Sequence, residues 1–247
     1  MNTSTFGLAR SYNTHLVVQP SDLRLGPPES YLFVQDGLII ICGLLYSLCY
    51  IFYTIRTYSD GRCAGPVVCV CGNLSYELFY ALTTTTTKFE KISFLIWFIL
   101  DIIFAATAVL STYSRGQRRM IISQILGGFF VGILALRILS AIFPDDRQQI
   151  TAYWTGILLE LPVGWVSVYL LVKSQDTRGH SIEIWLTRFL GCIAAYSVFL
   201  WRYLNVPENW AYVSSPWSVG VMVLTVISEI IYPFVYLRVR LQKEKIL

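Results

Sequence analysis

The chain has 247 residues, of which 55% are hydrophobic and only 14% charged, and its mean hydropathy is +0.57. Soluble domains usually carry about 25% charged residues, so this composition excludes a water-soluble globular protein. The net charge is only +4, and the basic residues lie between apolar stretches rather than in one patch, which argues against a nucleic-acid partner. The sequence therefore predicts an all-α, polytopic integral membrane protein.

The predicted elements begin with a polar N-terminal segment, residues 1–30, which lacks the apolar core of a cleavable signal peptide. Seven apolar stretches follow, each near the 20 residues that an α-helix needs to cross the hydrocarbon layer. They are predicted as spans at 31–55, 64–82, 92–113, 120–143, 150–172, 184–204 and 211–236. The chain thus divides into the N-terminal segment, a seven-helix transmembrane domain at 31–236, and a basic tail at 237–247. The short connections leave no room for a soluble catalytic domain.

Lysine and arginine are distributed unevenly between the two sets of loops. Eleven lie in the loops after the first, third and fifth predicted spans and in the C-terminal tail, all on one side of the membrane. Five, among them Arg10 and Arg147, lie on the other side. Cytoplasmic loops are enriched in these residues, so we expect a lumenal N-terminus and a cytosolic C-terminus. The ending Lys243-Glu244-Lys245-Ile246-Leu247 is similar to the dilysine signal that returns membrane proteins to the endoplasmic reticulum. A basic flank that stops translocation is the alternative reading.

No metal-binding pattern is present. The six cysteines lie mostly within apolar stretches and form no C-x-x-C pair, and His15 and His180 lie outside these stretches. Such cysteines are typical small apolar packing residues. We therefore predict neither a metal site nor a bound cofactor.

Ionisable side chains occur where hydrocarbon is expected. A charge at the centre of a bilayer costs a few kcal/mol, at least about 2.5, so such residues usually face the interior of the bundle and have a function. Four carboxyl groups at this depth exceed what packing requires. The ionisable residues well within predicted spans are Glu77, Asp101, Arg137, Glu160, Arg188 and Glu229.

Two of these glutamates have informative neighbours. Asn73 precedes Glu77 by four residues, so the amide and the carboxyl group share one helix face, where the amide could hold the carboxyl group in place. Pro233 follows Glu229 by four residues and removes the hydrogen bond to its carbonyl oxygen. A glutamic acid that keeps its proton in a dry cavity is a Brønsted acid toward whatever binds there. Alternatively, the carboxyl groups only fix the helix register by bonding to Asn73, Arg137 or Arg188.

The stretch from Cys71 to Tyr80, CGNLSYELFY, resembles the second-helix signature C-x-N-x-x-W-E-x-x-Y of the fungal membrane-bound terpene cyclases, the paxilline- and pyripyropene-type enzymes. The sixth stretch, WLTRFLG followed by WRY, and the final Ser215-Pro216 with an acidic residue thirteen positions later agree with this family. The resemblance covers about residues 31–240. Tyr76 stands where the family usually has Trp, and Glu229 where Asp is as frequent as Glu.

The resemblance implies a metal-independent cyclase that protonates the terminal epoxide, or the alkene, of a prenylated meroterpenoid or indole-diterpene precursor. Glu77 and Glu229 would be the catalytic pair and would share one water-poor chamber, with Asn73, Tyr76, Asp101 and Arg188 in support. The partners would be a lipophilic prenylated substrate, membrane lipid, and a prenyltransferase and an epoxidase upstream. We expect the enzyme in the endoplasmic reticulum membrane. A proton-coupled transporter of small solutes or a seven-span receptor remains the alternative, because intramembrane carboxyl groups suit a proton relay equally well.

Overall fold

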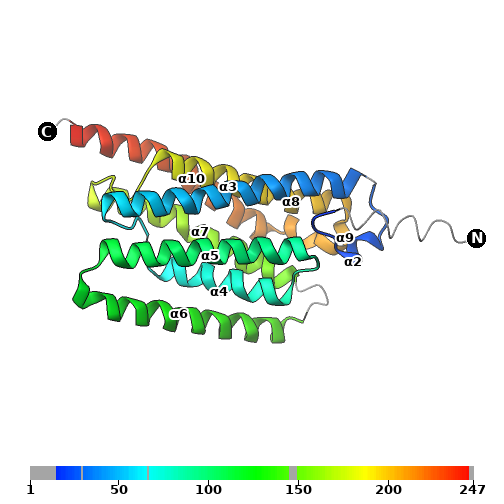
Figure 1. The fold of residues 1–247 in the computed structure, drawn as a ribbon. Helices are drawn as coiled ribbons and strands as arrows, with labels where there is room; N and C mark the ends of the chain where they lie inside the picture. The colour runs from blue at the N-terminus through cyan, green and yellow to red at the C-terminus, as the bar shows by residue number, and fades with distance from the viewer. Residues whose placement is uncertain (1–14, 29, 66, 145–148, 245–247) are drawn as a thin grey trace, which may run out of the picture.

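The computed structural model describes residues 15–28, 30–65, 67–144 and 149–244 and shows long helices packed side by side, with no strand among those residues (Figure 1). The predicted all-α architecture is confirmed. The loop residues 145–148, Arg10 and the dilysine residues from Lys245 onward lie outside the described part. The long helices are α3 (Ser30–Asp60), α4 (Val67–Thr83), α5 (Lys88–Thr112), α6 (Arg115–Ile142), α7 (Gln149–Ser174), α8 (Ile182–Asn205) and α10 (Pro216–Glu244).

Six of the long helices in the described part are long and apolar enough to cross a membrane, namely α3, α5, α6, α7, α8 and α10. The remaining one, α4, has 17 residues. At about 1.5 Å per residue it extends roughly 26 Å, which is less than the hydrocarbon thickness of about 30 Å. The structure therefore supports six candidate spans, and the predicted seventh, at 64–82, corresponds to a shorter helix.

The prediction that the last span starts at residue 211 is wrong. The chain there forms the short helix α9 (Pro207–Trp210) and a 3-10 turn (Ala211–Ser214), and α10 begins only at Pro216. Ser215 is extended, with φ −63° and ψ 147°. A residue before proline avoids the helical region, whereas proline itself fits the first turn of a helix. The apolar stretch is therefore interrupted at this point and the last helix continues to Glu244.

Helix packing places α6 at the margin of the bundle. The closest helix pairs are α3 with α8 and α7 with α10, while α4 packs against α5 and α6. Figure 1 shows α6 along one edge, and its contacts are mainly with α4. Most apolar side chains of α6 are exposed in the protein alone, so they would face lipid.

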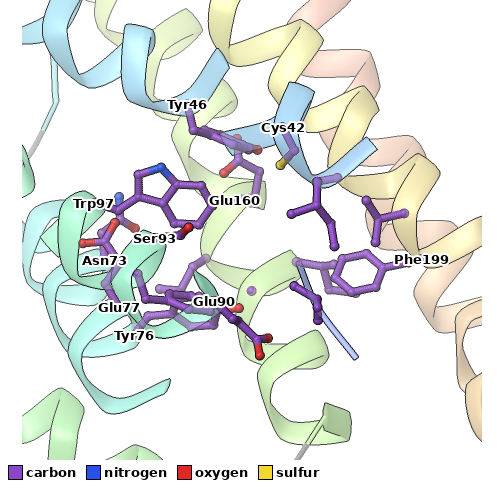
Figure 2. A pocket seen from close by; sticks show the side chains of 18 of the residues that line it. Cys42, Tyr46, Asn73, Tyr76, Glu77, Glu90, Ser93, Trp97, Glu160 and Phe199 are labelled. Carbon is purple, nitrogen blue, oxygen red and sulfur yellow. The ribbon is translucent and has the colours of Figure 1, made fainter. Parts of the chain in front are cut away.

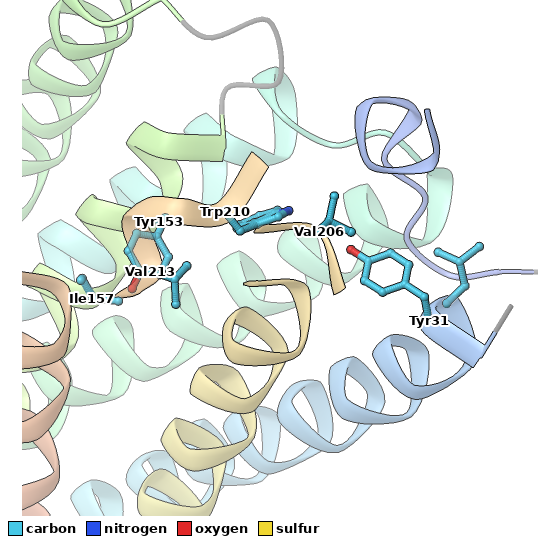
Figure 3. Close-up of a cluster of buried hydrophobic side chains, with 7 residues drawn as sticks. Tyr31, Tyr153, Ile157, Val206, Trp210 and Val213 are labelled. Carbon is cyan, nitrogen blue, oxygen red and sulfur yellow. The ribbon is translucent and has the colours of Figure 1, made fainter. Parts of the chain in front are cut away.

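One end of the bundle is closed by the segment before α3 together with α9. The carboxyl group of Asp22, in the short helix α2 (Pro20–Leu23), accepts hydrogen bonds from the Tyr31 hydroxyl at 2.9 Å, from Trp210 Nε1 at 3.0 Å and from Asn209 Nδ2 at 2.7 Å. A cluster of buried apolar side chains, including Tyr31, Trp210 and Val206, fills the space next to it (Figure 3). The two short helices are thereby fixed on the bundle as a cap.

At the opposite end, Asp176 in the connection between α7 and α8 links the connection between α3 and α4 to the end of α10. Its carboxylate pairs with Arg62 at 3.0 Å, Arg178 at 2.6 Å and Lys243 at 3.2 Å. His180 lies in the same connection, between α7 and α8, and its ring contacts the Tyr232 hydroxyl at 3.3 Å. Burial, and next the positive charges of Arg188 and Arg62, lower the pKa of His180 from 6.5 to about 4.

Candidate functional site

A cavity of about 270 Å³ lies inside the bundle between α3, α4, α5, α7 and α8. This volume is close to the lower end of the range for small-molecule sites, about 300–1,000 Å³. Figure 2 shows Glu77, Asn73 and Trp97 on one side of the cavity and Phe199 on the other. Eight aromatic side chains contribute to its wall: Tyr46, Tyr50, Tyr76, Phe89, Phe94, Trp97, Tyr196 and Phe199. We call this cavity the chamber.

Glu77 lies on the chamber wall and is only 3% exposed. Its Oε1 accepts a hydrogen bond of 2.6 Å from the Tyr50 hydroxyl, while its Oε2 has no partner among the described residues. The spacing predicted that the Asn73 amide holds the Glu77 carboxyl group directly. Instead, Asn73 donates to the Tyr50 hydroxyl at 3.4 Å. Asn73 and Glu77 do share a helix face, and both are directed toward Tyr50 of α3. No local sequence pattern identified Tyr50, because its contact depends on how α3 packs against α4.

The aromatic rings of the chamber are held in fixed orientations. The Tyr76 hydroxyl donates to the Ala152 carbonyl oxygen at 3.2 Å, and a Cβ atom at Gly156 would lie 3.0 Å from that hydroxyl. The Trp97 indole donates from Nε1 to Ser47 Oγ at 3.1 Å. The rings therefore present defined faces to the chamber, and aromatic faces attract positive charge.

Glu160 is a second carboxyl group on the chamber wall. It lies on α7 across from α4, and the Tyr46 hydroxyl of α3 is its hydrogen-bonding neighbour (Figure 2). From the sequence, Glu160 was identified as an ionisable residue within a predicted span, but no role was predicted for it. Its place on the wall follows from the rotation of α7, which hydropathy does not determine.

Glu229 is buried, at 1% exposure, but it is not among the residues that line the chamber. Its carboxylate forms two hydrogen bonds with the Arg188 guanidinium, Nε to Oε1 at 2.8 Å and Nη2 to Oε2 at 3.0 Å. Arg188 also donates to the Tyr53 hydroxyl at 2.6 Å and to Ser167 Oγ at 3.4 Å. The expectation that Glu77 and Glu229 line one chamber is therefore not met, because Glu229 is paired with Arg188 beside Gly164 of α7 and does not belong to the chamber wall.

The backbone around Glu229 follows the sequence expectation. Pro233 cannot donate to the Glu229 carbonyl oxygen, and the indole Nε1 of Trp185 donates to this oxygen instead, at 2.8 Å. A Cβ atom at Gly164 of α7 would lie 2.8 Å from Glu229 Oε1. Only glycine therefore lets α7 and α10 approach closely enough to bury the Arg188–Glu229 pair as observed.

Asp101 is 1% exposed, and neither of its carboxyl oxygens has a hydrogen-bond partner among the described residues. It lines a second, smaller cavity of about 70 Å³. Tyr50 and Asn73 belong to the walls of both cavities. Asp101 and Glu77 thus line separate cavities that share Tyr50 and Asn73, and no hydrogen bond joins the two carboxyl groups. In the described part of the chain, no three His, Cys, Asp or Glu side chains gather as ligands for one metal ion.

Comparison with known proteins gives a consistent result. The model of the Pyr4-like transmembrane terpene cyclases matches residues 21–242. The chain is 32% identical to the Pyr4-family terpene cyclase mfmH of Annulohypoxylon moriforme, over 91% of this chain and 94% of the relative. It is 29% identical to the terpene cyclase macJ of Penicillium terrestre, over 85% and 84% of the two chains, and 23% identical to the terpene cyclase pyr4 of Aspergillus fumigatus, over 91% and 95%. The chain therefore belongs to the Pyr4-like transmembrane terpene cyclases, and it is an enzyme that cyclises terpenoids rather than a transporter or a receptor.

Proposed function

We propose that the chamber binds the prenyl chain of a prenylated meroterpenoid or indole-diterpene precursor and that Glu77 starts its cyclisation by protonating the terminal epoxide or alkene. The observation that carries this proposal is that the two carboxyl oxygens of Glu77 differ in their hydrogen bonding. Oε1 accepts the Tyr50 hydrogen bond, whereas Oε2 has no partner among the described residues and lies on a wall dominated by aromatic and aliphatic side chains.

An unpaired carboxylate in such surroundings is costly, so the neutral acid is the favoured form. With Oε1 occupied as an acceptor, the acidic proton belongs on Oε2. Transfer of that proton to the epoxide oxygen breaks a C–O bond, and the π electrons of the next alkene close the first ring. The positive charge then passes along the chain as further rings form, and the aromatic faces stabilise it.

The final cation loses a proton to a base or is captured by water. We assign the base to Glu160, because its carboxyl group shares the chamber with Glu77 but comes from a different helix. Glu90 of α5 also lines the chamber, but its carboxyl group is engaged by the Thr86 backbone N–H at 2.8 Å.

Glu229 is proposed as a positioning residue. Its ion pair with Arg188 lies beside Gly164, one helical turn from Glu160. The pair holds Arg188 and its positive charge in place behind the chamber wall, although Glu229 itself does not line the chamber.

We further propose that α4 completes a seven-span arrangement, with its short length compensated by packing between α5 and α6. The N-terminus would be lumenal and the C-terminus cytosolic, in the endoplasmic reticulum membrane. A prenylated substrate partitions into lipid, so it can reach the chamber from the bilayer. Its chemistry requires a prenyltransferase upstream and, for the epoxide route, an epoxidase.

The test uses microsomes that contain the full-length chain and a set of prenylated, epoxidised aromatic acceptors. Glu77→Gln keeps the shape of the side chain but removes the acid, so product formation should fall by at least about 100-fold. Glu208→Gln in α9, an exposed glutamate, is the matched control and should leave activity unchanged. Normal amounts of product from Glu77→Gln would overturn the assignment.

Glu229 needs a separate readout. Glu229→Gln removes a charge from a buried ion pair, so a loss of activity alone would not separate positioning from folding. We expect Glu229→Gln to lower kcat with little change in KM, and Glu229→Asp to restore most of kcat. Equal loss in both variants, together with a loss of folded protein, would contradict the positioning role.

A further inference from the structure

The small cavity behind the chamber contains an unexplained acid. Asp101 is almost fully buried on its wall, and both of its oxygens lack a partner among the described residues. A cavity holds a water molecule once its volume exceeds roughly 10–15 Å³ and polar groups face it. The volume of about 70 Å³ and the polar groups of Asp101, Tyr50 and Asn73 satisfy both conditions.

The walls of this cavity join two networks that are otherwise separate. On one side, the Tyr50 hydroxyl is hydrogen-bonded to Glu77. On the other, the cavity is lined by Tyr53 and Ser167, which both accept hydrogen bonds from Arg188, the ion-pair partner of Glu229. Cys63 and Gly65, in the connection between α3 and α4, also line it, so the cavity extends toward a loop end of the bundle. Polar groups of the cavity wall thus lie between this loop end and Glu77, on a side that does not face the chamber.

The proposed reaction needs a route by which protons return to Glu77. Each turnover removes one proton from Glu77, and the closing step releases one proton from the cation to a different group. Glu77 must be reprotonated before the next substrate can react, while the chamber itself is occupied by product. Tyr50 can do this by donating its hydroxyl proton to Glu77 Oε1 and taking another from the cavity. A half-turn of the carboxyl group about its Cγ–Cδ bond then returns the protonated oxygen to the chamber side, and the bare oxygen becomes the new acceptor of the Tyr50 hydrogen bond.

We propose that the small cavity is a water-filled proton relay in which Asp101 supplies the proton that returns to Glu77 through Tyr50. This inference rests on the proposed role of Glu77 as the acid. Asp101 passes its proton to cavity water and then to Tyr50, and it recovers one from water at the loop end. One proton enters by this route and one leaves from the chamber, so the cycle has no net change in protons.

The test compares single and multiple turnovers of the full-length enzyme in lipid nanodiscs, with a prenylated, epoxidised acceptor that the wild type cyclises. With enzyme in excess, Glu77 is already protonated, so Asp101→Asn should react within about twofold of the wild-type rate. With substrate in excess, the same variant should be at least about tenfold slower, with a larger solvent deuterium isotope effect. Asp101→Glu should restore turnover. Thr107→Val, on the same helix, is the matched control and should match the wild type, because the Thr107 hydroxyl donates to the Ile103 carbonyl oxygen of its own helix.

A second variant guards against misfolding of Asp101→Asn. Val163→Ile adds one methylene to the wall of the small cavity without changing a polar group, and it should likewise slow only repeated turnover. Equal loss of single and multiple turnover in Val163→Ile and Asp101→Asn, or no loss in either, would overturn the relay. Failure of the proposed function looks different, because Glu77→Gln would then retain its first turnover.

Discussion

Removing the hydroxyl group of Tyr50 is the most specific perturbation of the candidate acid. This hydroxyl donates to Glu77 Oε1 at 2.6 Å and accepts from Asn73 Nδ2 at 3.4 Å. Tyr50→Phe leaves both oxygens of Glu77 without a partner and the Asn73 amide unsatisfied, while the aromatic ring that lines the chamber is kept.

The expected magnitude follows from these contacts. A buried hydrogen bond contributes about 0.5–1.5 kcal/mol net, and an unsatisfied buried polar group costs about 1–3 kcal/mol. The free energy of unfolding should therefore fall by about 2 kcal/mol. The larger effect should be on catalysis, because a carboxyl group displaced by about 1 Å loses roughly 100-fold in rate. We expect kcat to fall between about tenfold and 100-fold, with KM within about twofold.

Initial rates in microsomes, normalised to the amount of folded protein, measure this effect. Tyr58→Phe is the matched control, since Tyr58 lies on the same helix and is 76% exposed. If Tyr50→Phe kept the wild-type kcat while Glu77→Gln lost it, Glu77 would need no orientation by Tyr50. The argument from the Tyr50 hydrogen bond would then be refuted, along with the route through Tyr50 proposed for the relay.

Three further predictions concern stability, measured as thermal unfolding in detergent. Gly164→Ala should destabilise by about 1–3 kcal/mol, because its Cβ would overlap the Ser228 hydroxyl of α10. Gly220→Ala, whose Cβ would have nothing within 4 Å, should not destabilise. Protonation of His180 is disfavoured in the folded protein, so the neutral ring contributes stability that is complete above pH 6.5 and lost as the pH falls toward 4. The free energy of unfolding should therefore fall by about 2 kcal/mol between pH 7 and pH 5. His180→Gln should reduce this pH dependence. Asp22→Asn turns one acceptor oxygen of the cap into a donor facing other donors, so it should cost about 2 kcal/mol and loosen Trp210, visible as a change in tryptophan fluorescence. Unchanged melting of Gly164→Ala or of Asp22→Asn, or an unchanged pH dependence in His180→Gln, would contradict the contact concerned.

Hydropathy predicted most of the fold, because an apolar stretch of about 20 residues has few alternatives in a membrane. The six helices that meet the length and hydropathy of a span begin and end within five residues of the predicted stretches, except at the end of α10. That helix starts later, at Pro216, and continues eight residues past the predicted end, to Glu244. Hydropathy also predicted that ionisable residues face inward. Arg137 is the exception, because it lies exposed on α6 at the margin of the bundle, where no other helix covers it.

The candidate site was predictable only within single helices. The spacing of Asn73 and Glu77 placed both on one face, and Pro233 identified an open carbonyl at Glu229. Which residues of other helices meet these groups depends on helix rotation and crossing, which local patterns do not encode. Tyr50 and Glu160 therefore remained unassigned, and the pairing of Glu229 with Arg188 stood only as one of several register-fixing contacts. The predicted catalytic role of Glu77 stays a prediction, and so does the part of Glu229, for which the structure favours positioning.

The chamber wall is assembled from five helices and Val17, while α6 and α10 contribute no residue to it. Product outcome is then a property shared among distant stretches of sequence. A chimaera that takes only α6 from a relative should form the same rings as the unchanged enzyme. Exchange of any one helix of the chamber wall would instead join wall surfaces whose shapes do not fit each other. New skeletons are for this reason more accessible by small side-chain changes at the wall, one position at a time, than by recombination of whole segments.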